Sequence, residues 1–329
     1  MKIVIADPIF LTDDYRRQLD RLGDVEVFET YPADDAGFRD RIRDAEVVVV
    51  GRYGMRADAF AAAPHLRMVA VWQTGYDHID LEAATRAGVI VSNVPAYAFD
   101  AVAEFVFAFA LALLRRVRLA DARLREGQFD WRKHCGHQLM GMTIGVIGTG
   151  DIGRRVVQIA RGFGMRVLST TAHPSPERAA RLGLEFVDLS TLLAESDILT
   201  LHVPLTPSTE RMIGARELAL MKPGAILINT ARGRVVDEGA LVEALRTGRL
   251  TGAGLDVFEH EPLPAESPLR QLGNVILTPH IAFLTEESMD ECTYITIQNI
   301  ERFAAGRPEN VVNPEVLGSG TRAAPPPAS

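Results

Sequence analysis

Short apolar runs alternate with amphipathic segments along nearly the whole chain. In the first hundred residues the apolar runs are rich in valine, isoleucine and methionine, and the segments between them carry apolar residues at helical spacing. We expect strands at Lys2–Ala6, Val25–Val27, Val47–Val50, Met68–Trp72 and Val89–Ser92, with helices near Asp13–Leu22, Ala36–Asp44, Ala57–Ala63 and Leu81–Ala87. Strands that alternate with helices are typical of a parallel sheet covered by helices on both faces.

A second alternating series follows a long apolar helix, which is expected from about Asp100 to Val117. Its strands are expected near Thr143–Ile147, Met165–Ser169, Ile198–His202, Ala225–Asn229, Gly252–Asp256 and Val275–Thr278. The last helix, Glu286 to Ala304, leads to Val311–Asn313 with no further sheet, so we expect it to return to the first sheet. The fold class predicted is α/β with two doubly wound parallel-sheet domains.

The boundaries that this pattern predicts make the second domain an insertion in the first. Residues 1–98 and 287–317 would form a flavodoxin-like domain, and residues 99–286 an inserted Rossmann domain. The proline- and alanine-rich tail, residues 318–329, is expected to be disordered.

Composition and charge narrow the function classes. A chain of 329 residues with 47% hydrophobic and 24% charged residues is typical of a soluble globular protein of two domains. The net charge of −8, without a basic run, argues against a nucleic-acid partner. Cys135 and Cys292 are far apart, which predicts free thiols in a reducing cytoplasm and no metal site. The N-terminus resembles a strand rather than a signal peptide, and the apolar stretch Val102–Leu114 is too short for a bilayer, so no membrane association is expected.

A glycine-rich turn near the middle of the chain predicts a dinucleotide site. It follows the expected strand Thr143–Ile147 and opens a helical pattern from Ile152 to Ala160. Glycine turns of this kind also occur in α/β proteins that bind nothing, but the strand before it and the helix after it favour phosphate binding at the helix N-terminus. The predicted cofactor loop consists of Gly148, Thr149, Gly150, Asp151, Ile152 and Gly153.

Three chemically useful side chains follow three strands of the second domain. Arg232 comes just after the run that ends at Asn229, and Glu261 and His280 follow the next two runs. Ligands bind beyond the carboxyl ends of parallel strands, so we expect the three near the cofactor. Arginine can bind a carboxylate bidentately, histidine can deliver a proton to an alkoxide, and glutamate can orient the imidazole and favour its charged form. These residue types suit hydride transfer from a nicotinamide to a 2-keto acid. Alone, each could be a helix cap, a loop histidine or a turn residue.

Several longer stretches resemble the D-2-hydroxyacid dehydrogenase family, which includes glycerate, hydroxypyruvate/glyoxylate and phosphoglycerate dehydrogenases. The resemblance covers about residues 2–313. The matching stretches are Gln73–Asp80, Asn93–Pro95, Val102–Glu104, Gly148–Gly153, Leu201–Leu205, Asn229–Gly233, Leu255–Pro262 and Leu277–His280.

The resemblance implies a role for each candidate. Arg232 would bind and orient the substrate, Glu261 would support the histidine, and His280 would be the acid/base, with the three converging over a nicotinamide bound between two lobes. The implied substrate-binding positions are Arg52, Gln73, Thr74, Gly75, Tyr97 and Phe283, with the N–H groups of Thr74 and Gly75 holding the carboxylate. The implied cofactor positions beyond the glycine turn are Thr171, His173, His202, Val203, Pro204, Thr209, Thr230, Ala231 and Asp256. Family members are usually dimers built through the inserted domain, so a homodimer is expected.

The choice between NAD(H) and NADP(H) rests on the end of the second strand of the inserted domain. An acid that binds the adenosine ribose is expected there, and Thr171 stands in its place. A missing carboxylate removes the repulsion against a 2′-phosphate, and His173 could donate to that phosphate. Arg178 and Arg181 follow on the next helix, where we interpret them as solvated helix residues. NAD(H) is therefore favoured, with NADP(H) as the alternative.

The expected substrate is a small 2-keto acid, with an R-configured hydroxy acid as product. Arg52, beside Tyr53 and Gly54, suggests that the substrate has a second anionic or polar end, although Arg52 could instead bind the ordinary carboxylate or a structural acid. Glu261, where formate dehydrogenases carry glutamine, argues against formate, and Thr74, where phosphite dehydrogenase carries lysine, weakens phosphite. Two alternatives stay open: a reductase of a phosphonate-type substrate, and a dinucleotide-sensing scaffold like the corepressors of this fold.

Overall fold

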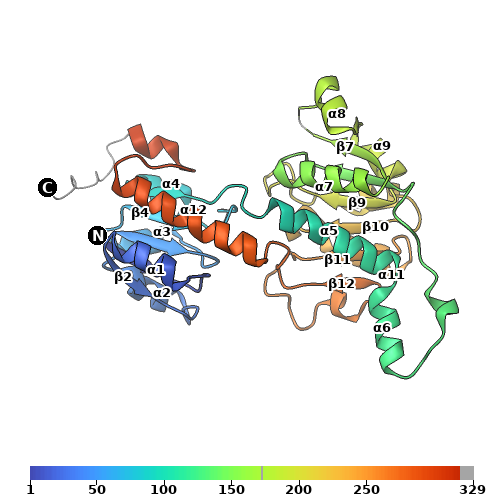
Figure 1. The fold of residues 1–329 in the computed structure, drawn as a ribbon, viewed down its shortest axis with the longest axis horizontal. Helices are drawn as coiled ribbons and strands as arrows, with labels where there is room; N and C mark the ends of the chain where they lie inside the picture. The colour runs from blue at the N-terminus through green and yellow to red at the C-terminus, as the bar shows by residue number, and fades with distance from the viewer. Residues whose placement is uncertain (172, 319–329) are drawn as a thin grey trace. The chain divides into compact units, whose positions relative to one another are not determined.

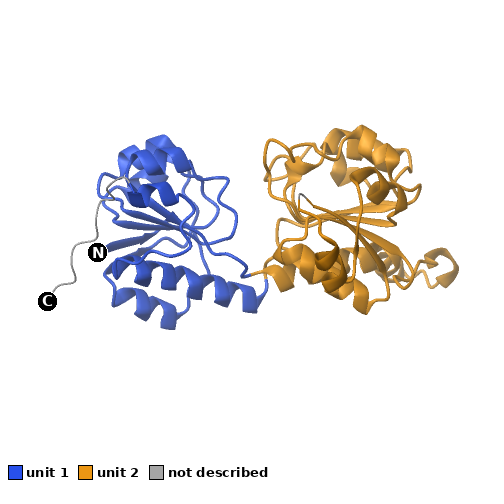
Figure 2. Cartoon of the chain, turned by 90° about the horizontal axis from the view of Figure 1, so that it is seen from above, with its two compact units in different colours: residues 1–97, 285–329 blue, residues 98–284 orange. Residues whose placement is uncertain are grey.

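The computed structural model describes residues 1–171 and 173–318, and the chain divides into two compact units. Unit 1 consists of Met1–Tyr97 and the chain from Thr285 onward, and unit 2 consists of Ala98–Leu284 (Figure 2). Each unit has one sheet, whose described strands pair in parallel, with helices on both sides of the sheet. The predicted α/β fold class with two parallel sheets is confirmed.

Unit 1 is built on a five-stranded sheet in the order β2-β1-β3-β4-β5. Figure 1 labels β2 and β4 of this sheet together with helices of the same unit. Its strands are β1 (Lys2–Ile5), β2 (Asp24–Val27), β3 (Val47–Val50), β4 (Met68–Val71) and β5 (Ile90–Ser92). Its helices are α1 (Asp13–Asp20), α2 (Asp35–Ile42), α3 (Ala57–Ala62), α4 (Leu81–Arg86), α12 (Glu286–Ala304) and the 3₁₀ helix η4 (Pro314–Gly318). The central strands β3 and β4 are buried throughout, as continuous apolar runs in a parallel sheet require. Side chains of α1 and α12 share a core cluster with one face of the sheet, and those of α2, α3 and α4 with the other.

Unit 2 is built on a seven-stranded sheet in the order β12-β11-β10-β9-β6-β7-β8. Its strands are β6 (Thr143–Ile147), β7 (Arg166–Thr170), β8 (Glu185–Phe186), β9 (Ile198–Leu201), β10 (Ile226–Asn229), β11 (Gly252–Leu255) and β12 (Val275–Leu277). Its helices are α5 (Phe99–Leu114), α6 (Val117–Arg125), α7 (Asp151–Gly162), α8 (Pro176–Leu182), α9 (Leu189–Glu195), α10 (Ala215–Leu220) and α11 (Glu238–Arg246), with 3₁₀ helices η1 (Trp131–His134), η2 (Gly233–Val235) and η3 (Pro268–Gln271). The strand order reverses between β6 and β9, which is the point where α/β sheets of this kind bind ligands.

The structure corrects the sequence prediction at two elements. The long apolar helix ends at Leu114 rather than Val117, because Arg116 adopts a left-handed conformation with φ of 52° and a new helix, α6, begins there. The strand β8 has only two residues, too few to give a periodic signal, and was not predicted. The predicted tail over residues 318–329 lies outside the described residues, except for Gly318 at the end of η4.

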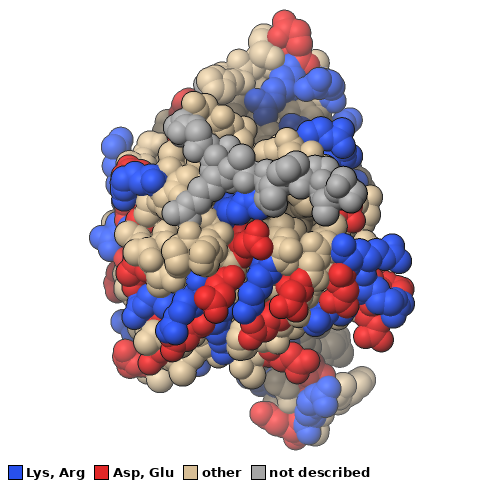
Figure 3. All heavy atoms as spheres, turned by 90° about the vertical axis from the view of Figure 1, so that its left-hand side faces the viewer, with Lys and Arg blue, Asp and Glu red and all other residues tan. Residues whose placement is uncertain are grey.

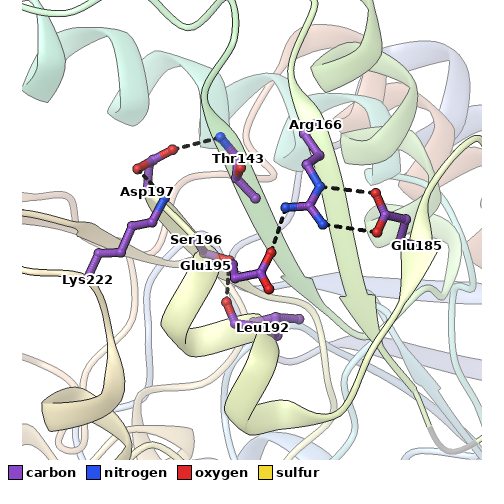
Figure 4. A network of polar contacts seen from close by, with 8 residues as sticks. All are labelled: Thr143, Arg166, Glu185, Leu192, Glu195, Ser196, Asp197 and Lys222. Atoms are coloured by element: carbon purple, nitrogen blue, oxygen red, sulfur yellow. Dashed lines mark hydrogen bonds and ion pairs between the residues drawn. The ribbon is translucent and has the colours of Figure 1, made fainter.

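Acidic side chains join the starts of several strands of unit 2 (Figure 4). Arg166, the first residue of β7, donates through Nε and Nη2 to the two carboxylate oxygens of Glu185 at 3.0 Å each and through Nη1 to Glu195 at 2.6 Å. Asp197 accepts the backbone N–H of Thr143 at 2.8 Å and the Lys222 ammonium at 2.9 Å. These contacts lie at the edge where the strands begin, so they support the sheet away from the ends that carry the candidate site residues.

Candidate functional site

The glycine turn after β6 leaves open space at the start of a long helix. Gly148 has φ of 92°, and a Cβ there would lie 2.4 Å from the carbonyl oxygen of His202, while a Cβ on Gly153 would lie 2.1 Å from that of Gly148. Both glycines are therefore required by packing within the protein. Gly150 differs, because a Cβ there would meet no described atom within 4 Å. Gly150 is also the N-cap of α7, so the open space faces helix N–H groups, which fits the pyrophosphate of a dinucleotide.

Arg178 lies against the glycine turn, contrary to our interpretation of it as a solvated helix residue. Its Nη2 donates to the carbonyl oxygen of Thr149 at 2.7 Å and to the Thr149 hydroxyl at 2.6 Å, and its Nη1 donates to the carbonyl oxygen of His173 at 3.2 Å. Thr149 is buried, whereas Arg181, one turn along the same helix, is exposed. Arg178 thus joins the glycine turn to the segment that follows β7, where Thr171 is half-buried and His173 exposed.

The loop after β9 packs against the glycine turn, and its polar side chains bind other groups of the protein. His202 Nε2 lies 3.0 Å from the Thr200 hydroxyl, and desolvation lowers the pKa of His202 to about 3, so its ring is neutral at physiological pH. Val203 packs 3.0 Å from the position that a Cβ on Gly148 would take. Thr209 donates its hydroxyl to the carbonyl oxygen of Pro204 at 2.6 Å. The polar side chains of His202 and Thr209, expected to contact cofactor, therefore already have partners in the protein.

His280 and Glu261 form a hydrogen-bonded pair. His280 Nδ1 lies 2.8 Å from one carboxylate oxygen of Glu261, and the other oxygen accepts the backbone N–H of Phe258 at 3.0 Å. The ring of Phe283 meets the imidazole edge-on, with centroids 6.1 Å apart. Pairing through Nδ1 assigns proton exchange with a ligand to Nε2 of the ring. The side chains of the pair are partly exposed, at 33% for His280 and 36% for Glu261, so the pair is accessible.

Asp256 organises the loop that carries His280. Its buried carboxylate accepts the backbone N–H groups of Ile281 and Ala282 at 2.8 Å each, together with the Thr278 hydroxyl. The sequence does not show which amides the Asp256 carboxylate binds. From the sequence alone we therefore expected Asp256 only to contact the cofactor. In the structure this carboxylate binds the backbone just after the histidine and the Thr278 side chain just before it.

The loop after β10 places Arg232 beside the loop that carries Glu261. The Asn229 side chain accepts the N–H of Ala231 at 3.0 Å and donates to the carbonyl oxygen of Arg232 at 2.9 Å. Gly233 packs so closely on the backbone of Phe258 that a Cβ would lie 1.9 Å from its carbonyl carbon. Since β10, β11 and β12 are neighbours in the sheet, the three loops bearing Arg232, Glu261 and His280 are brought together at one edge.

Thr230 offers a further sign of a ligand at this edge. Its hydroxyl is buried and has no hydrogen-bond partner among the described residues. A buried hydroxyl without a partner is costly in a folded protein and is commonly satisfied by a ligand or an ordered water. Together with the open space at Gly150, this hydroxyl means that the residues present fit a nicotinamide dinucleotide along the edge from β6 to β10.

The candidate substrate residues of unit 1 follow neighbouring strands of its sheet. Gln73 donates its amide to the carbonyl oxygen of Gly75 at 2.9 Å, Thr74 donates its hydroxyl to that of Val94 at 2.7 Å, and Asn93 donates to that of Thr74 at 2.7 Å. The turn is thereby held through its carbonyls and side chains, while the N–H groups of Thr74 and Gly75 meet no acceptor among the described residues.

Two further substrate candidates sit after other strands of the same sheet. Arg52 follows β3 and is exposed, and Tyr97 follows β5 and is half-buried. The candidate substrate residues of unit 1 therefore come from the carboxyl ends of three neighbouring strands, β3, β4 and β5.

Comparisons with known proteins agree with this geometry. The family model described as D-isomer specific 2-hydroxyacid dehydrogenase, NAD binding domain, matches residues 107–282. A glyoxylate reductase from Thermococcus litoralis is 46% identical over 267 residues, which cover 78% of this chain and 80% of that protein. A solved acyclic imino acid reductase in complex with NADPH and D-Arg has a TM-score of 0.87 at 33% identity, covering 95% of this chain and 100% of that one. A D-lactate dehydrogenase from Aquifex aeolicus, complexed with NAD and lactic acid, has a TM-score of 0.82 at 30% identity, covering 99% and 100%.

Proposed function

This chain belongs to the D-isomer specific 2-hydroxyacid dehydrogenase family, and we propose that it reduces a small 2-keto acid to the R-configured 2-hydroxy acid. Membership of this family makes it an oxidoreductase that transfers hydride between NAD(H) and 2-keto or 2-hydroxy acids. The observation that carries the proposal is the 2.8 Å contact between His280 Nδ1 and Glu261, on the same sheet edge as the glycine turn. We further propose that unit 1 is the substrate domain and that unit 2 holds the cofactor.

The residues at this sheet edge have separate roles in the reaction. A bound nicotinamide supplies the hydride, which no side chain can supply. The Arg232 guanidinium binds the substrate carboxylate and polarises the keto oxygen. His280 gives the Nε2 proton to that oxygen as it becomes an alkoxide, and Glu261 stabilises the imidazolium before transfer and keeps the ring oriented. The N–H groups of Thr74 and Gly75 supply further donors for a carboxylate.

Replacement of His280 tests this division. We expect His280→Ala to lower kcat about 10²–10⁴-fold while the Kd of the cofactor stays near normal, because only proton transfer is lost. His260→Ala, which removes an exposed histidine from the neighbouring loop, is the matched control and should behave like the wild type. Steady-state rates with glyoxylate and cofactor fluorescence titrations give both quantities. Unchanged turnover in His280→Ala would exclude His280 from the mechanism.

We propose that the substrate carries a second anionic or polar group, which the exposed Arg52 supports. We expect kcat/KM for hydroxypyruvate, or for a phosphono keto acid, to exceed that for 2-ketobutyrate, whose tail is apolar, by about tenfold or more. The measurement is loss of reduced-nicotinamide absorbance over this panel. Equal values for polar and apolar tails would remove the second-group proposal without affecting the assignment of the reaction.

We propose that Arg178 lets the NAD(H) site accept NADP(H) as well. Its guanidinium already lies beside the glycine turn and the segment after β7, where a ribose 2′-phosphate is expected, and Thr171 brings no negative charge there. We expect Arg178→Ala to raise the KM for NADPH about tenfold and that for NADH much less. Arg181→Ala is the control, and Thr171→Asp should shift preference toward NADH. A loss equal for both cofactors would mean that Arg178 only supports the turn.

We propose that a second copy of the chain covers α6 and the segment that follows it. No residue of α6 is buried, and apolar side chains remain exposed at Leu119, Leu124, Phe129, Trp131 and Met140. By contrast, the apolar helix α5 buries much of its surface within unit 2.

Sedimentation equilibrium tests this homodimer. The wild type should sediment as a dimer, and the double variant Leu124→Glu with Trp131→Glu should shift toward monomer, because charge is placed on the covered surface. Leu220→Glu changes an apolar residue exposed at 40% elsewhere in unit 2 and should leave the dimer intact. A monomeric wild type would contradict the proposal.

We propose that the protein has no nucleic-acid partner, which its surface charge supports. Acidic and basic side chains are mixed over the face drawn in Figure 3, and the net charge is −8. No helix in the described part of the chain is long and apolar enough to cross a membrane. We propose a cytoplasmic location, in keeping with Cys135 and Cys292, neither of which forms a disulfide. Anisotropy titration with duplex DNA at low salt should show no binding.

A further inference from the structure

A buried carboxylate in unit 1 binds three consecutive backbone amides. Asp7 follows β1 and its side chain is inaccessible to solvent. One carboxylate oxygen accepts the N–H of Gly51 at 2.7 Å, and the other accepts those of Arg52 and Tyr53 at 2.9 Å each. Hydrogen bonds to an ionised acceptor are among the stronger ones in proteins. Asp7 thus holds the start of the loop that follows β3.

The far end of that loop is also fixed. The ring of Tyr53 stacks on Phe38 with centroids 4.5 Å apart. The N–H of Met55 donates to the carbonyl oxygen of His78 at 3.2 Å, beside the bridge between Met55 and Ile79. Within this anchored loop Arg52 is an exposed side chain. An anchored backbone therefore carries an exposed arginine.

Burial gives the ionised Asp7 carboxylate an electrostatic cost. Burial raises the pKa of the Asp7 carboxyl, although its three backbone N–H partners and the charge of Arg41 act in the opposite direction. Because the pKa is raised on folding, the stability that this group contributes is present below its unfolded pKa and is lost as pH rises through the folded pKa. The ionised form therefore stabilises the fold less than the protonated form would. What the carboxylate provides in return is the conformation of residues 51–53.

We propose that Asp7 is a positioning residue for substrate selection, which fixes residues 51–53 so that Arg52 meets the second anionic or polar group of the keto acid in one conformation. The proposal rests on the proposed function, which supplies the keto acid. A guanidinium on a preorganised loop loses less conformational entropy when it binds, so the gain should appear in KM rather than in kcat. A keto acid without a second group should not sense it.

A double-mutant cycle with Asp7→Asn and Arg52→Gln tests the proposal with two substrates. Hydroxypyruvate has a second polar group and glyoxylate has none. We expect Asp7→Asn to raise the KM for hydroxypyruvate about tenfold, with kcat, the glyoxylate KM and the cofactor Kd within about twofold of the wild type. In the Arg52→Gln background, Asp7→Asn should add less than about twofold, because the two residues act as one unit. Asp44→Asn, an exposed carboxylate before β3, is the control.

The outcomes separate the two proposals. An equal rise in KM for glyoxylate, or the same factor for Asp7→Asn in both Arg52 backgrounds, would overturn the role of Asp7 while leaving the enzyme's function standing. A wild type that turns over no 2-keto acid would instead overturn the proposed function. If Asp7→Asn fails to fold, Asp7→Glu replaces it in the double-mutant cycle. This variant keeps the charge and moves the carboxylate by one methylene, and the same results support or overturn the proposal.

Discussion

The buried carboxylate of Asp256 is the contact on which the candidate site most depends. It accepts the N–H groups of Ile281 and Ala282 and so fixes the backbone around His280, whose imidazole can then meet Glu261 at 2.8 Å. The close packing of Gly233 on the Phe258 backbone joins the Arg232 loop to the same assembly. The loops that carry Arg232, Glu261 and His280 are therefore held by strand ends and buried hydrogen bonds, and Glu261 in addition orients the His280 ring. This is the preorganisation that acid–base chemistry requires.

The two edges of the unit 2 sheet have different roles. At the edge where the strands begin, Arg166 and Asp197 join neighbouring elements through ion pairs and backbone contacts (Figure 4). At the edge where they end, polar groups remain available to a ligand: helix N–H groups beside Gly150, and the Thr230 hydroxyl, which has no partner within the described residues. Unit 1 repeats the principle, since Asp7 orders its strand-end loop while the N–H groups of Thr74 and Gly75 remain available to a ligand.

Sequence predicted most of the fold because its signals are periodic and local. The apolar runs fixed the position of eleven strands, and the glycine turn identified the dinucleotide loop. What it missed depends on three-dimensional contact. The sequence indicated a solvated helix residue at Arg178, which the fold brings to Thr149, and it gave no sign that Asp7 binds the amides of a distant loop. The helix breaks at Arg116, a single residue in the left-handed conformation, and the spacing of apolar residues along the chain does not indicate such a break.

The most direct test of the acid–base pair compares two neighbouring glutamates. Glu259 lies two residues before Glu261 but pairs with Arg211 at 2.7 Å, so Glu259→Gln makes the same chemical change without touching His280. Single-turnover oxidation of NADH by glyoxylate should slow about 10–10²-fold in Glu261→Gln and by less than about twofold in Glu259→Gln. Equal rates in the two variants would contradict a role for the Glu261–His280 pair in proton transfer.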